Sequence, residues 1–87
     1  MSSPATGRPM PRWTVYSRAE CTLCERMLEE LARLIGPDAA RHVQVIDVDS
    51  DPELARRYGS KVPVLMADGE FVCAWRLDEQ RVRAHLS

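Results

Sequence analysis

The chain has 87 residues, of which 45% are hydrophobic and 29% are charged, and its formal net charge is −1. This length allows one small domain with a modest core, and the composition is that of an ordinary globular protein. The nearly balanced charge argues against a nucleic-acid or anionic-membrane partner, which a basic surface would attract. No apolar run reaches the ~18 residues that a membrane span needs, so we expect no membrane partner.

The N-terminal segment 1–11 is rich in proline and glycine and lacks the apolar stretch of roughly 7–15 residues that a secretory signal contains. We expect a disordered tail there, followed by one domain over residues 12–87. Three cysteines are an odd count, so at most one bridge forms within the chain. This usage favours a reactive pair in a reducing cytoplasm over a secreted disulfide scaffold.

A cysteine pair follows the first β-type run, residues 13–16. Cys21-Thr-Leu-Cys24 comes after a turn and directly before a helical pattern. At the start of a helix, free backbone N–H groups and the macrodipole stabilise a thiolate, which lowers a cysteine pKa from about 8.5 to roughly 3.5–7.5. Residues i and i+3 of a helix lie about 5–6 Å apart at Cβ, so a small adjustment closes a disulfide. We predict Cys21 as the attacking thiolate and Cys24 as the resolving thiol.

Two other interpretations of the pair stay open. A zinc site needs four ligands, and the remaining soft candidates, Cys73, His42 and His85, stand singly without a second close pair. A chance pair of structural cysteines is the other alternative. The order of strand, cysteine pair and helix favours redox chemistry over both, so we expect no metal.

The segment behind the cysteine pair predicts a helix followed by a strand. Residues 22–35 have one stripe of apolar side chains at helical spacing, which we assign to the core. Gly36 and Pro37 end that helix, because glycine is typical of a helix C-terminus and proline cannot continue it. Residues 42–48 form a β-branched run that favours a strand.

An aspartate cluster separates this strand from a second helix over residues 52–58. Asp47, Asp49 and Asp51 lack the spacing and the glycine turn of an EF-hand, so we interpret them as a strand end and a helix cap rather than a cation site. We expect Ser50 to be the cap. The proline and the glutamate behind it suit the first turn of a helix and a capping box.

The C-terminal part predicts a hairpin and a closing helix. Residues 62–67 and 70–75 are strand-like runs joined by Asp-Gly, a strong tight-turn signal, and a helix begins at residue 77 or 78 and ends at 86. We expect Cys73, which shares strand parity with Phe71 and Trp75, to be a buried small hydrophobe. A third redox cysteine is the alternative.

The elements in order are β-α-β-α-β-β-α, which indicates an α/β fold. A helical crossover between the first two strands implies that these strands are parallel and that the connection is right-handed. The last two strands form an antiparallel hairpin. We therefore predict a four-stranded mixed sheet flanked by helices.

These features resemble the glutaredoxin-like members of the thioredoxin superfamily, and most closely the small bacterial proteins with Cys-x-Leu-Cys. The resemblance covers roughly residues 13–86. It is carried by Cys21-Thr-Leu-Cys24 behind the first strand, by Val62-Pro63 before the third strand, and by the order of elements. It implies a thioredoxin-like fold and thiol–disulfide oxidoreductase activity in cell redox homeostasis, with a redox disulfide between Cys21 and Cys24.

The resemblance also implies residues that bind substrate. The family has a cis peptide before the proline that matches Pro63, and it pairs the backbone of the preceding residue, here Val62, with substrate or glutathione. Arg18 stands where many glutaredoxins have a lysine near the thiolate and the glutathione carboxylate. Glu20 acts in the opposite direction, because a neighbouring carboxylate raises the pKa of the Cys21 thiol. The alternatives are an edge-strand proline and a solvated arginine.

Two departures from the glutaredoxin pattern bear on glutathione. Glutaredoxins usually have Pro-Tyr between the cysteines, where this chain has Thr22-Leu23. They usually follow the fourth strand with Gly-Gly and a Ser-Asp or Thr-Asp that binds the γ-glutamyl end of glutathione. Here Cys73-Ala74 replace the glycines, and Asp78 lies one residue out of register. The Cys-Gly-Phe-Ser motif of the cluster-carrying glutaredoxins is absent.

We therefore expect a monomeric thiol–disulfide oxidoreductase without a bound cofactor, with glutathione as an open co-substrate. Its substrate is a disulfide-containing protein or a small thiol compound, and a cellular reductant resets the pair. The alternative is a non-catalytic thioredoxin-fold module that binds a partner or senses redox state and does not bind glutathione. A metal-binding module that uses Cys21 and Cys24 in a dimer is the third hypothesis.

Overall fold

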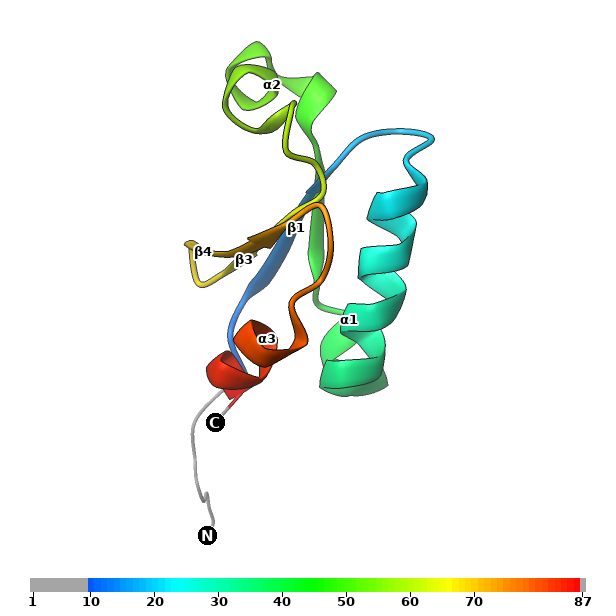
Figure 1. Cartoon of the computed structure of the whole chain (residues 1–87), viewed down its shortest axis with the longest axis vertical. Helices are drawn as coiled ribbons and strands as arrows, with labels where there is room; N and C mark the ends of the chain where they lie inside the picture. Colours follow the sequence, from blue (N-terminus) through cyan, green and yellow to red (C-terminus); the bar gives the residue numbers. More distant parts are fainter. Residues whose placement is uncertain (1–9, 87) are drawn as a thin grey trace, which may run out of the picture.

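The computed structural model describes residues 10–86, which fold around one four-stranded mixed sheet (Figure 1). The tail predicted at 1–11 therefore lies outside the described residues, except for Met10 and Pro11. Within the described range, no helix is long and apolar enough to cross a membrane. The elements in chain order are β1 (Trp13–Ser17), α1 (Thr22–Ala40), β2 (Gln44–Asp47), the 3-10 turn η1 (Val48–Ser50), α2 (Pro52–Tyr58), β3 (Val64–Ala67), β4 (Glu70–Ala74) and α3 (Glu79–Leu86).

The sheet has the strand order β2-β1-β3-β4. β1 and β2 are parallel and are connected through α1, while β3 pairs antiparallel with both β1 and β4. This confirms the predicted α/β class, the order of elements and the hairpin. In Figure 1, α1 and α3 lie toward one side of the sheet, whereas α2 lies apart at the far end of the molecule. None of the residues of α2 is buried.

The hydrophobic core lies between the sheet and the helices α1 and α3. Removing each such side chain from water contributes roughly 1.5–3 kcal/mol, so this contact holds α1 against the sheet. The first residues of α1, which carry the cysteine pair, are positioned by that packing. The side chains that are most deeply buried in this cluster are Val15, Met27, Leu31, Leu65 and Val82.

The helix end predicted at Gly36 and Pro37 is a kink in α1. Gly36 has φ 89° and ψ 162°, a backbone conformation that glycine adopts without a Cβ clash. Pro37 begins a further helical turn, where its missing N–H is not needed. Arg41 N donates to Pro37 O at 3.3 Å, and the helical path continues to Ala40. The prediction missed this turn because glycine and proline at a helix end are also compatible with a restart.

The second strand is shorter than the predicted run 42–48. The N–H groups of His42 and Val43 bond back to the end of α1, to Ala39 O and Ala40 O, and therefore do not join the sheet. Val48 leaves the strand as well, because it begins the 3-10 turn η1.

The aspartates after β2 confirm a strand end and a helix cap, with one error. Asp47 accepts a hydrogen bond from Asp49 N at 2.8 Å, and Asp51 accepts one from Glu53 N at 2.8 Å. Asp51 is thus the N-cap of α2, and the prediction of Ser50 as cap is wrong. The Ser50 hydroxyl donates instead to Asp47 O at 2.6 Å, which tightens the preceding turn.

A bulge in β4 overturns the predicted parity of Cys73. Leu65 pairs with Cys73 and Met66 pairs with Phe71, so Val72 is an extra residue on β4. Val72 and Cys73 are consequently both buried, while Phe71 is exposed. The predicted burial of Cys73 is confirmed, but Phe71 does not share its side of the sheet.

Candidate active site at the start of α1

Cys21 and Cys24 form a disulfide across the first turn of α1. Cys21 is the N-cap residue with φ −112° and ψ 104°, and Cys24 lies inside the helix. Their Cα atoms are 5.2 Å apart, within the usual range for a disulfide. The turn between β1 and α1 that leads to this position contains Glu20 in a left-handed conformation, with φ 56°. This arrangement places the pair where the sequence predicts it.

The two sulfurs differ in access and in hydrogen bonding. The Cys24 side chain is only 2% exposed, whereas Cys21 is partly exposed. Cys24 N donates to Cys21 Sγ at 3.2 Å. A backbone donor directed at a sulfur, at the positive end of a helix, favours the thiolate form of that sulfur in the reduced pair. Cys21 is therefore the more accessible sulfur of the pair.

The peptide bond between Val62 and Pro63 is cis, as the resemblance implied. Strand β3 begins at Val64 and not at the predicted residue 62, since Val62 and Pro63 lie in the irregular connection between α2 and β3. Pro63 is fully buried and its carbonyl accepts a hydrogen bond from Trp75 N at 2.8 Å. Val62 makes no hydrogen bond with any residue in the range 10–86, so its backbone N–H and C=O are available.

Arg18 is held by the scaffold around the site. Its guanidinium donates to Asp49 at 2.9 and 3.3 Å and to Gly59 O at 3.1 Å. The hydrogen bonds and the charge of Asp49 raise the pKa of Arg18. Arg18 precedes Cys21 by three residues, and Gly59 precedes Val62 by three residues. The side chain therefore joins the loop that carries the cysteines to the segment that carries Pro63. Its role in binding substrate stays a prediction.

Trp75 is bound to the segment that precedes β3. It follows β4 in a left-handed conformation with φ 68°, which costs a residue other than glycine on the order of 1 kcal/mol. Two hydrogen bonds hold it there, from its backbone N–H to Pro63 O and from its indole N–H to Ser60 O at 3.3 Å. The ring is nevertheless 54% exposed. Sequence reasoning did not assign Trp75 to the site, although its position directly after Cys73-Ala74, which replace the glycines of glutaredoxins, was a signal.

A cavity of about 230 Å³ lies between Trp75 and the first turns of α1. Leu23, which separates the two cysteines, forms part of its wall and is 42% exposed. The cavity thus has the residue between the two cysteines on one side and the proline-bound tryptophan on the other. The residues that line it are Leu23, Arg26, Met27, Glu30, Trp75, Arg76 and Leu77.

Cys73 and Asp78 take structural positions. The Cys73 side chain is 6% exposed, and burial raises the pKa of its thiol, which disfavours a third reactive thiolate. Asp78 precedes α3, where its carboxylate accepts a hydrogen bond from Arg81 N at 3.2 Å and pairs with the Arg81 guanidinium. Within residues 10–86, no three His, Cys, Asp or Glu side chains lie close enough together to hold a metal ion.

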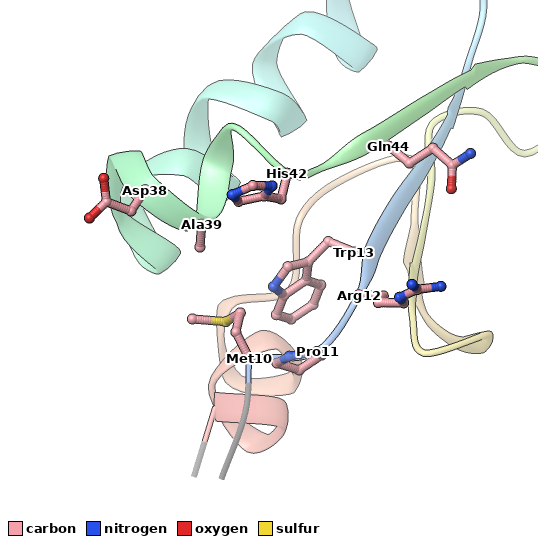
Figure 2. Close-up of a pocket in the computed structure, with 8 residues that line it drawn as sticks. All are labelled: Met10, Pro11, Arg12, Trp13, Asp38, Ala39, His42 and Gln44. Carbon is pink, nitrogen blue, oxygen red and sulfur yellow. The ribbon is translucent and has the colours of Figure 1, made fainter. Parts of the chain in front are cut away.

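A larger cavity, of about 750 Å³, lies at the other end of the chain's first helix. Figure 2 shows Trp13 between the Met10–Pro11 segment on one side and Ala39, at the end of α1, and His42 on the other. Trp13 is 2% exposed, and its indole N–H has no hydrogen-bond partner among the described residues. Neither the cysteines nor the two residues between them line this cavity. It therefore lies apart from the cysteine pair.

Known proteins resemble this chain in sequence and in fold. A protein of Mycobacterium tuberculosis described as uncharacterized is 33% identical over 82 residues, which is 88% of this chain and 84% of that protein. The solution NMR structure of protein Ne2328 from Nitrosomonas europaea is 31% identical, with a TM-score of 0.81 and full coverage of both chains.

The X-ray structure of protein XcR50 from X. campestris is 33% identical, with a TM-score of 0.68 over 85% of this chain and 93% of that one. The family model described as "Glutaredoxin-like domain (DUF836)" matches residues 12–87. This match spans the sheet, the three helices and the cysteine pair. The chain therefore belongs to the glutaredoxin-like domain family.

Proposed function

We propose that the chain is a thiol–disulfide oxidoreductase that cycles between a Cys21/Cys24 dithiol and the disulfide. The observation that carries this proposal is the asymmetric pair, in which Cys21 caps a helix and is partly exposed while Cys24 is buried one turn inside. Such asymmetry assigns one sulfur to attack and the other to resolve. We further propose that it works as a monomer in the cytoplasm, where its third cysteine stays reduced.

The proposed reaction consists of two successive thiol–disulfide exchange steps. The Cys21 thiolate attacks one sulfur of a substrate disulfide, forms a mixed disulfide and displaces the other sulfur as a thiolate. Cys24 loses its proton and attacks the Cys21 sulfur, which releases the second substrate thiolate. The substrate gains two electrons, and the chain is left with the Cys21–Cys24 disulfide. A cellular dithiol, or two molecules of glutathione, then returns two electrons to the pair.

Substrate positioning falls to the segment around Pro63. Val62 has a free backbone N–H and C=O beside the buried proline, so an extended substrate segment can pair with it as an added strand. Arg18 supports this arrangement by bridging the cysteine loop and the segment after α2.

A second candidate function is a redox-sensing or binding module without glutathione. It is favoured by Asp78, whose carboxylate already accepts from the start of α3 and pairs with Arg81. In the glutaredoxin pattern a nearby aspartate binds the γ-glutamyl end of glutathione. A sensor would form the same disulfide but would not turn over a substrate.

The reduction potential of the pair, measured with thiol trapping in glutathione redox buffers, tests the oxidoreductase proposal. We expect one two-electron transition between roughly −200 and −270 mV, the range of glutaredoxins and thioredoxin. Cys73→Ser is the matched control, since it leaves the pair intact and should give the same transition. Turnover of hydroxyethyl disulfide then separates enzyme from sensor. A chain that shows the transition but no turnover above Cys21→Ser would favour the sensor.

A further inference from the structure

The surface next to the disulfide combines exposed apolar groups with unpaired positive charge. Leu23 and Trp75 are both large and substantially exposed, and they face the same cavity. Trp75 is held in this exposed position by two hydrogen bonds in spite of its left-handed backbone. A strained, half-exposed aromatic residue beside a reactive group is a feature that structures keep for binding.

The size of the cavity limits what enters it. Sites for whole small-molecule ligands usually measure about 300–1,000 Å³. The cavity beside Trp75 measures about 230 Å³, and its apolar lining residues are Leu23, Trp75 and Leu77, with the buried Met27 beneath them. It therefore suits one side chain of a larger partner better than a complete cofactor. The exposed faces of Leu23 and Trp75 make an apolar side chain the complementary occupant.

The rim of the cavity carries charge that the chain does not neutralise. Arg26 and Arg76 form no ion pair with any residue in the range 10–86, although Glu30 lines the same cavity. Five other arginines in that range do pair with an acidic residue. The rim thus has two cations and one anion, and its net positive charge is complementary to a carboxylate.

We infer that the dithiol acts on polypeptide disulfides in which an apolar side chain and a carboxylate flank the cysteine. The apolar side chain enters the cavity between Leu23 and Trp75, and the carboxylate binds Arg26 and Arg76 at the rim. This inference rests on the proposed function, since it names the substrate class of that same site. Glutathione has carboxylates that can bind the two arginines, but it has no apolar side chain that can enter the cavity.

Four mixed disulfides with one chromogenic thiol test the inference. Three are short peptides whose cysteine is flanked by leucine and glutamate, by leucine and lysine, or by serine and glutamate, and the fourth is the glutathione adduct. Attack of reduced Cys21 on the peptide sulfur releases the chromogenic thiolate, which is read by absorbance. We expect the leucine–glutamate peptide to react about 3–10-fold faster than each of the others at low salt.

The variants Arg26→Glu and Arg76→Glu should each reduce the ratio of the glutamate to the lysine peptide at least about twofold. Arg33→Glu is the matched control, because Arg33 is an exposed, unpaired arginine on the same helix that does not line the cavity. It should keep the ratio. Ratios of rates cancel any general effect of charge on the Cys21 thiolate. Equal rates for the two leucine peptides, a preference that survives both variants, or a faster glutathione adduct would overturn the inference.

A binding measurement distinguishes an error in the proposed binding surface from an error in the proposed disulfide exchange. If reduced chain releases no chromogenic thiolate above Cys21→Ser, the proposed function is wrong. The leucine–glutamate peptide with serine in place of cysteine is then titrated into the oxidised chain, and the NMR signal of the Trp75 indole N–H is followed. A shift that Arg76→Glu weakens supports the surface without the chemistry. No shift at about 1 mM peptide overturns it.

Discussion

The two tryptophans of the chain lie in opposite environments. Trp75, beside the disulfide, is 54% exposed, and its backbone and indole N–H groups both donate to carbonyls. Trp13, at the start of β1, is 2% exposed, and its indole N–H lacks a partner among the described residues. Trp13 instead packs edge-on against His85, with 6.2 Å between ring centroids.

Cavity size therefore does not identify the end of this molecule that carries the cysteine pair. The cavity next to Trp13 is the larger, at about 750 Å³ against about 230 Å³ next to Trp75. Yet the smaller one is the cavity that Leu23, the residue before Cys24, helps to line. Trp13 contributes buried apolar area to the core. Trp75 is held in its exposed position by two hydrogen bonds, although its left-handed backbone conformation is unfavourable. Mutations should therefore affect stability at one end and exchange chemistry at the other.

The largest effect is expected at the reactive end. Cys21→Ser should lower the rate of disulfide exchange to the background of the uncatalysed reaction, because it removes the nucleophile. Cys24→Ser should accumulate a mixed disulfide with substrate, visible as a mass increase that a reductant reverses. Cys73→Ser should retain the activity of the parent. Full turnover by the Cys21→Ser chain would contradict the assignment of the two sulfurs.

The next largest effect is a difference in folding stability between variants of the two tryptophans. Trp13→Ala should cost about 3–5 kcal/mol of the free energy of unfolding, because it empties a buried site in the core. Trp75→Ala should cost less than about 1.5 kcal/mol, since half of that ring is already in water. Urea unfolding of the oxidised chains measures both.

Trp13→Phe is the conservative control for this pair. It keeps most of the buried ring and removes the unpaired N–H, so we expect a loss below about 1.5 kcal/mol. If the two alanine variants lost equal amounts of unfolding free energy, the assignment of Trp13 to the core and Trp75 to the surface would be wrong.

A smaller effect is expected for Arg18, whose ion pair with Asp49 is partly exposed. Arg18→Ala should destabilise the chain less than Trp13→Ala does, and it should also slow disulfide exchange because it releases the segment that leads to Pro63. Arg18→Lys restores the charge but not the three donor directions, so we expect partial recovery. Rates and unfolding midpoints are compared with Arg33→Ala. An unchanged rate in Arg18→Ala would leave Arg18 only a structural role.

The smallest effect concerns pH. Burial raises the pKa of the Cys73 thiol, so the folded chain holds this proton more tightly than the unfolded chain. The resulting stabilisation is complete below the unfolded thiol pKa of about 8.5 and is lost as the pH rises through the raised folded value. Cys73→Ala should therefore flatten the fall in unfolding midpoint between about pH 8 and 10. Tyr16, whose pKa is also raised by burial, is present in both chains and cancels.

Much of this fold follows from local patterns. The stripe over residues 22–35, the β-branched runs and the Asp-Gly turn predicted the helix, the strands and the hairpin that the structure contains. The errors lie where nearly equal local choices compete. Ser50 and Asp51 both suit a helix cap, and the backbone path selects Asp51. The bulge at Val72, which places two successive side chains in the core, has no signature in a pattern of period two.

The sequence alone determined the order of elements and the place of the cysteine pair, because hydrophobic periodicity and turn chemistry act over short distances along the chain. Tertiary packing decided which groups meet. Arg18 bridges to Asp49 and Gly59, and Trp75 joins Pro63 to the cavity beside Leu23, through contacts between residues that are far apart in the chain. Such contacts depend on how the helices pack against the sheet, and no local sequence pattern encodes that packing.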